Sequence, residues 1–423
     1  MSAFSSTIRA GSVDISPTSP TVLGANGLPR LKIANVEDPL EANILILGRD
    51  PNPLILISCD LLYIGYPLRQ LIDTGLADIT PPAKILVAAS HTHRATMTDP
   101  TKTGLGDADS EQIRVIATKI CTEVKKIHLT KAAAVSAEIG FGRHNAGINR
   151  RKKRLVRLSR SGFSFNTVSI GPNPAGPVDP VVRRVRFKDA IGNPVAEIWS
   201  TALHPTGYPR RETISADFPG QVRVAIRGQN KSDTPVLFLQ GFGGNIRPNT
   251  PVNRSGLRKF LVGSKFAGFT TNSYFTWVRE LVKNVLSAEF SGLTGEGIDT
   301  VRLLISQNLL VEGAQGPPSA WIHAVRIGVL GIIAVPSEVV VEYSSSLSAL
   351  EGDRSGLMHL WGIGCVDHVW GYTPTRRMLV EGGYEAEGFC EPFGVERVSP
   401  NVEEDLRLAL EKTVLALVTD NRI

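Results

Sequence analysis

The sequence predicts an α/β protein of mixed α+β type, in which mixed β-sheets are flanked by helices. Three observations favour this fold class. Short apolar runs typical of strands alternate with longer segments of helical periodicity along the chain. Several of these runs are continuously apolar, as in strands that are buried on both faces. No internal repeat or linker divides the 423 residues, so we expect residues 1–423 to form a single domain.

The expected strands are apolar runs bounded by turn residues. Residues 41–50 and 53–60 are predicted to form two neighbouring buried strands, because the turn sequence "RDPNP" joins them. Residues 320–336 are predicted to form a pair of strands on the same grounds. These segments would supply part of a sheet that is covered on both sides.

The expected helices show apolar residues at spacings of three and four. In residues 109–127 this pattern follows Asp109, and Gln112 stands three residues further on, as in a helix-capping sequence. Residues 270–289 and 401–418 are predicted to be helical for the same reason. Strands and helices of this kind pack in layers around a common core.

Composition excludes several classes of protein. The net charge of +6 is spread over 46 basic and 40 acidic residues, so we expect no nucleic-acid partner. The longest apolar runs are shorter than a membrane span, so no membrane insertion is expected. The first residues lack the charged and apolar segments of a secretory signal, and the four cysteines form no CxxC pair. These features predict a cytoplasmic protein with reduced thiols.

Polar side chains follow several apolar runs at the point where each run ends. His91 and His93 close one run, and alternate residues of a strand share a face. Other runs end at Asp60, His204, Asn245 and Glu338. Sheets of this kind bind ligands outside the carboxyl ends of their strands. We therefore expect one site in which two imidazoles and a carboxylate bind zinc and leave a position for water.

Each of these features also has a simpler explanation on its own. An HxH pair can belong to a loop, His204 before Pro205 can cap a strand, and Glu338 can begin a helix over residues 338–350. Their occurrence together at strand ends favours the metal site. The sequence contains no G-x-S-x-G, P-loop, complete G-x-G-x-x-G or H-E-x-x-H motif, so serine hydrolases and nucleotide-binding proteins are less favoured.

A series of motifs resembles the catalytic domain of the neutral ceramidases, a family of metal-dependent amidases. The motifs occur in the order of that family, and the segment 178–206 follows the family pattern throughout. They are "GSVDISP", "LISCDLL", "SHTH", "GINR", "ISADFPG", "FLQGFGGNIRPN", "VPSE", "WGYTPT" and "GGYE". The resemblance implies a chain that consists of the catalytic domain, with the family's C-terminal immunoglobulin-like domain absent.

The resemblance also implies roles for individual residues. The implied zinc ligands are His91, His204, Glu338 and Tyr372. The implied catalytic residues are His93, Arg150 and Tyr384. The first three ligands also follow from the strand-end pattern, whereas Tyr372 follows from the resemblance alone. Arg150 opens the basic run at residues 150–160, which by composition predicts a solvated loop.

Two arginines depart from the family pattern beside the expected site. Arg247 stands where the family has a serine, and Arg94 begins "RAT" where the family usually has Ser-Gly-Pro. A serine nucleophile is excluded at position 247. Arginine suits bidentate recognition of a carboxylate, so we expect Arg94 and Arg247 to bind an anionic group of the substrate. The simpler alternative is that both turn outward or pair with acidic residues such as Asp217.

The expected function is therefore zinc-dependent hydrolysis of an amide bond in a small, soluble N-acyl compound. Zinc would activate water and polarise the carbonyl, His93 would protonate the leaving amine, and Arg150 and Tyr384 would stabilise the oxyanion. Two alternatives stay open. One is a metal-dependent esterase or lactonase, or a barrel amidohydrolase that also uses HxH. The other is a non-catalytic protein that binds zinc or a ligand. The sequence does not indicate an oligomeric state.

Overall fold

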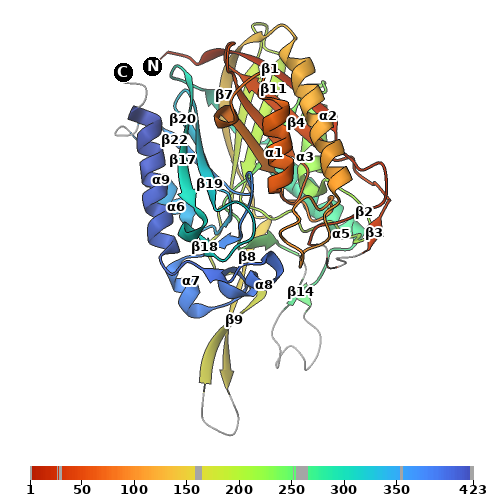
Figure 1. Cartoon of the computed structure of the whole chain (residues 1–423), viewed down its shortest axis with the longest axis vertical. Helices are drawn as coiled ribbons and strands as arrows, with labels where there is room; N and C mark the ends of the chain where they lie inside the picture. The colour runs from red at the N-terminus through yellow and green to blue at the C-terminus, as the bar shows by residue number, and fades with distance from the viewer. Residues whose placement is uncertain are drawn as a thin grey trace.

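Two β-sheets pack face to face, and helices cover their outer faces (Figure 1). This arrangement is seen in a computed structural model that describes residues 2–25, 27, 31–157, 164–250, 252–253, 265–352 and 356–419. It confirms the predicted mixed α+β fold, in which mixed sheets are flanked by helices.

The larger sheet has nine strands, in the order β12-β11-β10-β7-β1-β4-β5-β6, with β16 paired to β7. Its strands are β1 (Ser5–Asp14), β4 (Glu41–Leu47), β5 (Leu54–Cys59), β6 (Ile85–Ala89), β7 (Ala133–Arg143), β10 (Val181–Lys188), β11 (Pro194–Thr201), β12 (Val236–Gln240) and β16 (Glu289–Gly292). Only β5–β6 and β11–β12 are parallel pairs among the pairings described for this sheet. The strand pair predicted at residues 41–60 is confirmed as β4 and β5.

The larger sheet curls until its edge strand β12 reaches β4 and β5. The Ser58 hydroxyl donates to the Phe238 carbonyl at 2.6 Å, and the Val236 amide donates to Asn43 Oδ1 at 3.1 Å. The intervening antiparallel pairings make β6 and β11 run in opposite directions. The carboxyl ends of these two strands therefore do not lie at one edge of a parallel sheet.

The smaller sheet has four strands in the order β17-β19-β20-β22. They are β17 (Ile298–Ser306), β19 (Ser319–Ile327), β20 (Leu330–Ala334) and β22 (His359–Ile363). The strand pair predicted at residues 320–336 is confirmed as β19 and β20. Its inner face packs on the larger sheet through an apolar core that includes Leu56, Leu86, Leu237, Ile332 and Trp361.

The end of β22 and the segment that follows it join the two sheets. Ile363 bridges to Gly241 beyond β12, and Val366 bridges to Ala88 in β6. Two short parallel strands complete this region, β21 (Glu338–Val339) and β23 (Tyr372–Thr373), in which Glu338 lies opposite Tyr372. Glu338 therefore does not begin a helix, because it belongs to β21, and the next helix starts at Tyr343.

The helices form the outer layers. The larger sheet is covered by α1 (Tyr66–Gly75), α2 (Ser110–His128), α3 (Asp217–Asn230) and α5 (Thr271–Leu286), and the smaller sheet by α6 (Tyr343–Ser348) and α9 (Val402–Thr419). The three predicted helices are confirmed as α2, α5 and α9. Asp109 caps α2 as expected, since its carboxylate accepts from the backbone amides of Glu111 and Gln112.

A hairpin extends from the body of the molecule (Figure 1). It is formed by β8 (Gly147–Arg157) and β9 (Ser164–Asn173), and β13 (Ile246–Pro248) pairs with β8 at its base. The prediction of a solvated loop at residues 150–160 is wrong for residues 150–157, which belong to β8. Residues 158–160 lie outside the described residues.

Several short elements complete the described structure. These are β2 (Thr21–Val22), β3 (Lys32–Ile33), β14 (Val252–Asn253), β15 (Lys265–Phe266), β18 (Val311–Glu312), β24 (Arg397–Val398), α7 (Arg376–Glu381), α8 (Cys390–Phe393), the 3₁₀ turns Pro82–Lys84 and Gln307–Leu309, and a π-helical turn at Tyr384–Gly388. Over the described ranges, no helix combines the length and the apolar character that a membrane crossing requires.

Candidate metal centre

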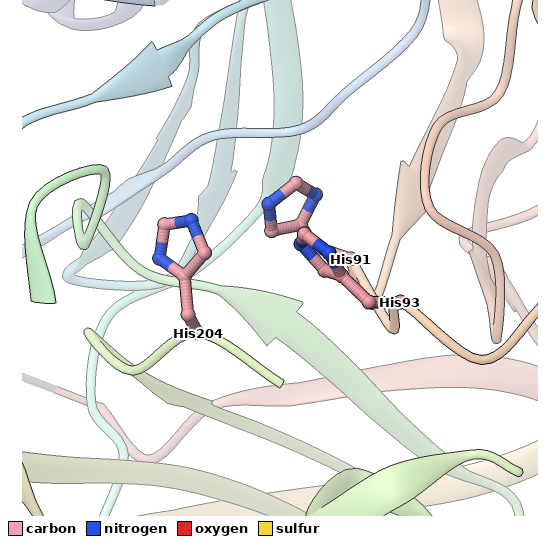
Figure 2. Close-up of side chains that lie close together, drawn as sticks. All are labelled: His91, His93 and His204. Carbon is pink, nitrogen blue, oxygen red and sulfur yellow. The ribbon is translucent and has the colours of Figure 1, made fainter. Parts of the chain in front are cut away.

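Three buried or half-buried histidines face one another at the ends of β6 and β11. Ring nitrogens of His91, His93 and His204 all lie within 4.8 Å of one another. Figure 2 shows His204 approaching from one side and the other two rings from the opposite side. The three groups could hold a metal ion. The sequence predicted His91 and His204 as metal ligands and His93 as a catalytic residue, and the structure places all three together.

Backbone carbonyls fix the orientation of all three rings. The Nδ1 atoms lie 3.1, 3.0 and 2.8 Å from the carbonyl oxygens of Leu62, Ala25 and Gly243, in the order His91, His93 and His204. Because a carbonyl oxygen can only accept, each Nδ1 carries the proton in the neutral ring. Each Nε2 therefore presents a lone pair, and this tautomer is the one that metal-binding histidines adopt when a second group holds their other nitrogen.

Glu338 stands beside two of these lone pairs. Its Oε2 lies 3.3 Å from His91 Nε2 and 3.0 Å from His204 Nε2. Two ligands that are each ~2.0–2.2 Å from one tetrahedral zinc lie roughly 3.3–3.6 Å apart. The contact of Glu338 with His91 has this spacing, and its contact with His204 is shorter. The Nε2 atoms of His91 and His93 are buried, and neither has a hydrogen-bond partner in the described part of the chain. The residues present therefore fit a divalent metal.

The local charges agree with such a ligand set. Burial, reinforced by His91 and His204, lowers the pKa of His93 well below its usual value, and burial lowers the pKa of His204 to about 4. Burial would raise the pKa of Glu338, but His91 and His204 outweigh it and hold that pKa well below the usual range. His91 differs, because burial is outweighed by Cys365 and Glu338 and its pKa is raised.

The backbone at the site is strained or closely packed. His91 has a φ of +66°, a left-handed conformation that is uncommon for a residue with a side chain. Its amide donates to the Leu61 carbonyl at 2.8 Å, which holds this conformation. A Cβ atom on Gly244 would lie 2.6 Å from the Glu338 carbonyl oxygen. The glycines of "QGFGGN" thus allow the chain to pass directly behind Glu338.

The segment "ISADFPG" connects the two histidine loops. Thr92, between the paired histidines, donates its hydroxyl to the Ser215 carbonyl at 2.9 Å. The buried Asp217 accepts from the amides of Gly207 and Tyr208, at 3.0 and 3.1 Å, in the loop that follows His204. This segment links the two loops through hydrogen bonds, and these bonds do not involve the ring nitrogens.

Two other polar residues that the sequence placed at strand ends, Asp60 and Asn245, have partners away from the histidines. The Asp60 carboxylate pairs with Arg223 at 2.8 Å. The Asn245 side chain donates to Glu342 at 2.8 Å and accepts from the Val341 amide at 2.9 Å. Both residues therefore support neighbouring segments, although their position at strand ends predicted a place in the site.

Arg150 lies between the two tyrosines that the resemblance implied. Its guanidinium carbon is 5.4 Å from the ring centroid of Tyr372 and 5.3 Å from that of Tyr384. Glu385, which sequence reasoning missed, receives hydrogen bonds from Arg150 at 2.7 Å and from Arg151 at 2.8 Å. Its only sequence signal is that it follows Tyr384. The register of β21 and β23 places Tyr372 opposite Glu338.

The two arginines that depart from the family pattern have different surroundings. Arg94 is buried and donates to the carbonyls of His93 and Tyr208, both at 3.2 Å. Arg247, on β13, is half-buried with its guanidinium carbon 5.3 Å from the ring centroid of Phe266. Burial, and then the charge of Arg150, lower the pKa of Arg247 to about 10. No carboxylate among the described residues pairs with Arg247.

Comparisons with known proteins place the fold. No protein-family model and no curated protein matches the chain. The neutral ceramidase from Pseudomonas aeruginosa superposes with a TM-score of 0.76 at 15% identity, over 98% of this chain and 75% of that chain. A ceramidase complexed with C2 gives a TM-score of 0.74 at 16% identity, over 97% of this chain and 75% of that one. The chain thus has the fold of the neutral ceramidases, which confirms the resemblance inferred from its motifs at the level of structure.

Proposed function

We propose that this protein is a zinc-dependent hydrolase that cleaves an amide bond. Our proposed zinc ligands are His91, His204, Glu338 and Tyr372. The observation that carries the proposal is the convergence of buried Nε2 lone pairs on the carboxylate of Glu338. The ceramidase-like fold supports an amidase reaction, since fold and site agree, although a fold by itself hosts many activities.

The chain's own residues would carry the proton transfers. A zinc ion bound at this site would supply a Lewis acid and lower the pKa of a bound water. His93 keeps its Nδ1 proton on the Ala25 carbonyl, so its free Nε2 can accept a proton and pass it to the leaving amine. Arg150 and Tyr384 would donate to the carbonyl oxygen as negative charge develops on it.

We further propose that the substrate is a small, soluble N-acyl compound with an anionic group that Arg247 binds. The charge of Arg150 is balanced by Glu385, whereas Arg247 has no acidic partner among the described residues. Residues 254–264, which follow β14, contain neither Asp nor Glu. A half-buried guanidinium is unfavourable without an anion, so a substrate carboxylate would complete the pair. Arg94 has its own carbonyl partners, and we propose no substrate contact for it.

A substrate panel tests this proposal. Zinc-loaded protein would be given short N-acyl amino acids, the matching neutral N-acyl amines, esters and lactones of the same acids, and a fluorescent ceramide. We expect the N-acyl amino acids to be cleaved most efficiently. Efficient ceramide hydrolysis would contradict the substrate class, and cleavage of esters or lactones alone would contradict the amidase assignment. The four free cysteines support action in a reducing compartment, for which we propose the cytoplasm.

A further inference from the structure

Three consecutive residues beyond β5 all contact the candidate metal centre. The Leu61 carbonyl accepts from the His91 amide at 2.8 Å, and the Leu62 carbonyl accepts from His91 Nδ1 at 3.1 Å. The next residue, Tyr63, donates its hydroxyl to Oε1 of Glu338. One short segment therefore holds both a histidine and the carboxylate of the proposed ligand set.

The ring of Tyr63 is held tightly in place. It is 2% exposed and packs against the rings of His91 and Phe393, with centroids 5.3 and 5.9 Å away. The ammonium of Lys102 lies 5.5 Å from the Tyr63 centroid, and Asp99 anchors that ammonium in turn. A ring fixed on several sides delivers its hydroxyl to one place.

The two carboxylate oxygens of Glu338 have different partners. Oε1 accepts the hydrogen bond from the Tyr63 hydroxyl, while Oε2 faces the Nε2 atoms of His91 and His204. A phenol is neutral near neutral pH and can therefore donate to a carboxylate. A carboxylate without such a donor could rotate and offer either oxygen, or both. A phenylalanine at position 63 would pack equally well, so packing does not explain the presence of the hydroxyl.

We propose that Tyr63 is a positioning residue of the metal centre, whose hydroxyl turns Oε2 of Glu338 toward the metal. This inference rests on the proposed function, because it takes the metal to lie between Glu338 and the histidines. Groups that hydrogen-bond to metal ligands orient them, and removal of such a partner typically weakens metal binding by about 10–100-fold. Tyr63 has this relation to Glu338.

The test compares metal affinity in Tyr63→Phe and the unaltered protein. Metal-stripped proteins would compete with a chromophoric chelator for zinc, with no substrate present. We expect Tyr63→Phe to bind zinc about 10–100-fold more weakly. Tyr343→Phe is the matched control, because it removes another buried hydroxyl, whose bond goes to the Pro374 carbonyl at 3.0 Å. That variant should bind zinc as the unaltered protein does.

A second measurement separates positioning from packing. In a Glu338→Ala background, Tyr63→Phe should cause no further loss of affinity, because its effect acts through the carboxylate. An equal loss in both backgrounds would overturn the inference, as would unchanged affinity of Tyr63→Phe in a protein that does bind zinc. The proposed function would survive either result. If the unaltered protein binds no zinc, the metal centre and this inference both fail.

Discussion

His204 Nε2 lies 3.0 Å from Oε2 of Glu338, although the two residues are 134 positions apart and follow strands of different sheets. His204 follows β11 of the larger sheet, and Glu338 follows β20 of the smaller one. The contact therefore depends on how the two sheets pack, and a metal held there would stabilise the folded protein as well as serve a reaction.

His93→Ala should keep the metal but lose roughly two to four orders of magnitude in turnover of the preferred substrate, the usual scale for a general acid-base group. Metal analysis and a rate assay on the same preparation would show both effects. Loss of zinc from His93→Ala, with zinc retained by His91→Ala, would mean that the two histidines exchange the roles proposed for them.

Arg247→Ser should reduce cleavage of N-acyl amino acids and leave cleavage of matching neutral amides almost unchanged. A charge-assisted hydrogen bond contributes ~1.5–3 kcal/mol, which corresponds to roughly 10–150-fold in kcat/KM. Arg186→Ser is a control, since Arg186 pairs with Glu197 in the larger sheet. An unchanged ratio of the two activities in Arg247→Ser would remove Arg247 from the substrate site.

Gly244→Ala should destabilise the fold by about 1–3 kcal/mol, because the added methyl group would meet the Glu338 carbonyl and force a backbone shift. Gly228→Ala in α3 is the control. Its added Cβ has no atom within 4 Å, and alanine favours a helix by about 1 kcal/mol. Denaturant unfolding of both variants measures the difference, and equal midpoints would contradict the close contact.

Acid should destabilise the protein partly through His144, which is not one of the proposed ligands. Its Nε2 bonds the Thr201 hydroxyl at 2.6 Å and its Nδ1 accepts from the Ala146 amide at 3.1 Å. Burial lowers its pKa to about 4 from 6.5, so the folded state prefers the neutral ring. This contribution is fully present above pH ~6.5 and is lost as the pH falls through about 4. His144→Gln should flatten the stability profile between these values, and an unchanged profile would exclude His144 as a cause.

Much of the fold was predictable from local sequence patterns. The periodicity of residues 109–127 and the Asp109 cap are properties of neighbouring residues, and α2 follows them within one residue at each end. The paired strands at 320–336 were predictable for the same reason. The strand formed by residues 150–157 was not predictable, because their positive charge suggested a loop. Two of them, Arg150 and Arg151, are buried against Glu385, which lies 234 or more positions away in the chain.

The candidate site was predictable only in part. The polar ends of apolar runs pointed to His91, His204 and Glu338, which the structure brings together. The same pattern pointed to Asp60, but Arg223 from α3 takes that carboxylate, and such a partner cannot be seen from the strand alone. Tyr63 gave no signal, because a tyrosine in an apolar segment is usually a packed ring and its partner is 275 positions away.

The metal content of the purified protein, measured together with that of His91→Ala and His204→Ala, tests the central claim most directly. The proposed centre predicts about one zinc per chain, and each variant should lose it, because each removes one ligand of a single site. Tyr343→Phe should keep its zinc. Full zinc content in both histidine variants, or no zinc in the unaltered protein after loading, would contradict the metal centre described here.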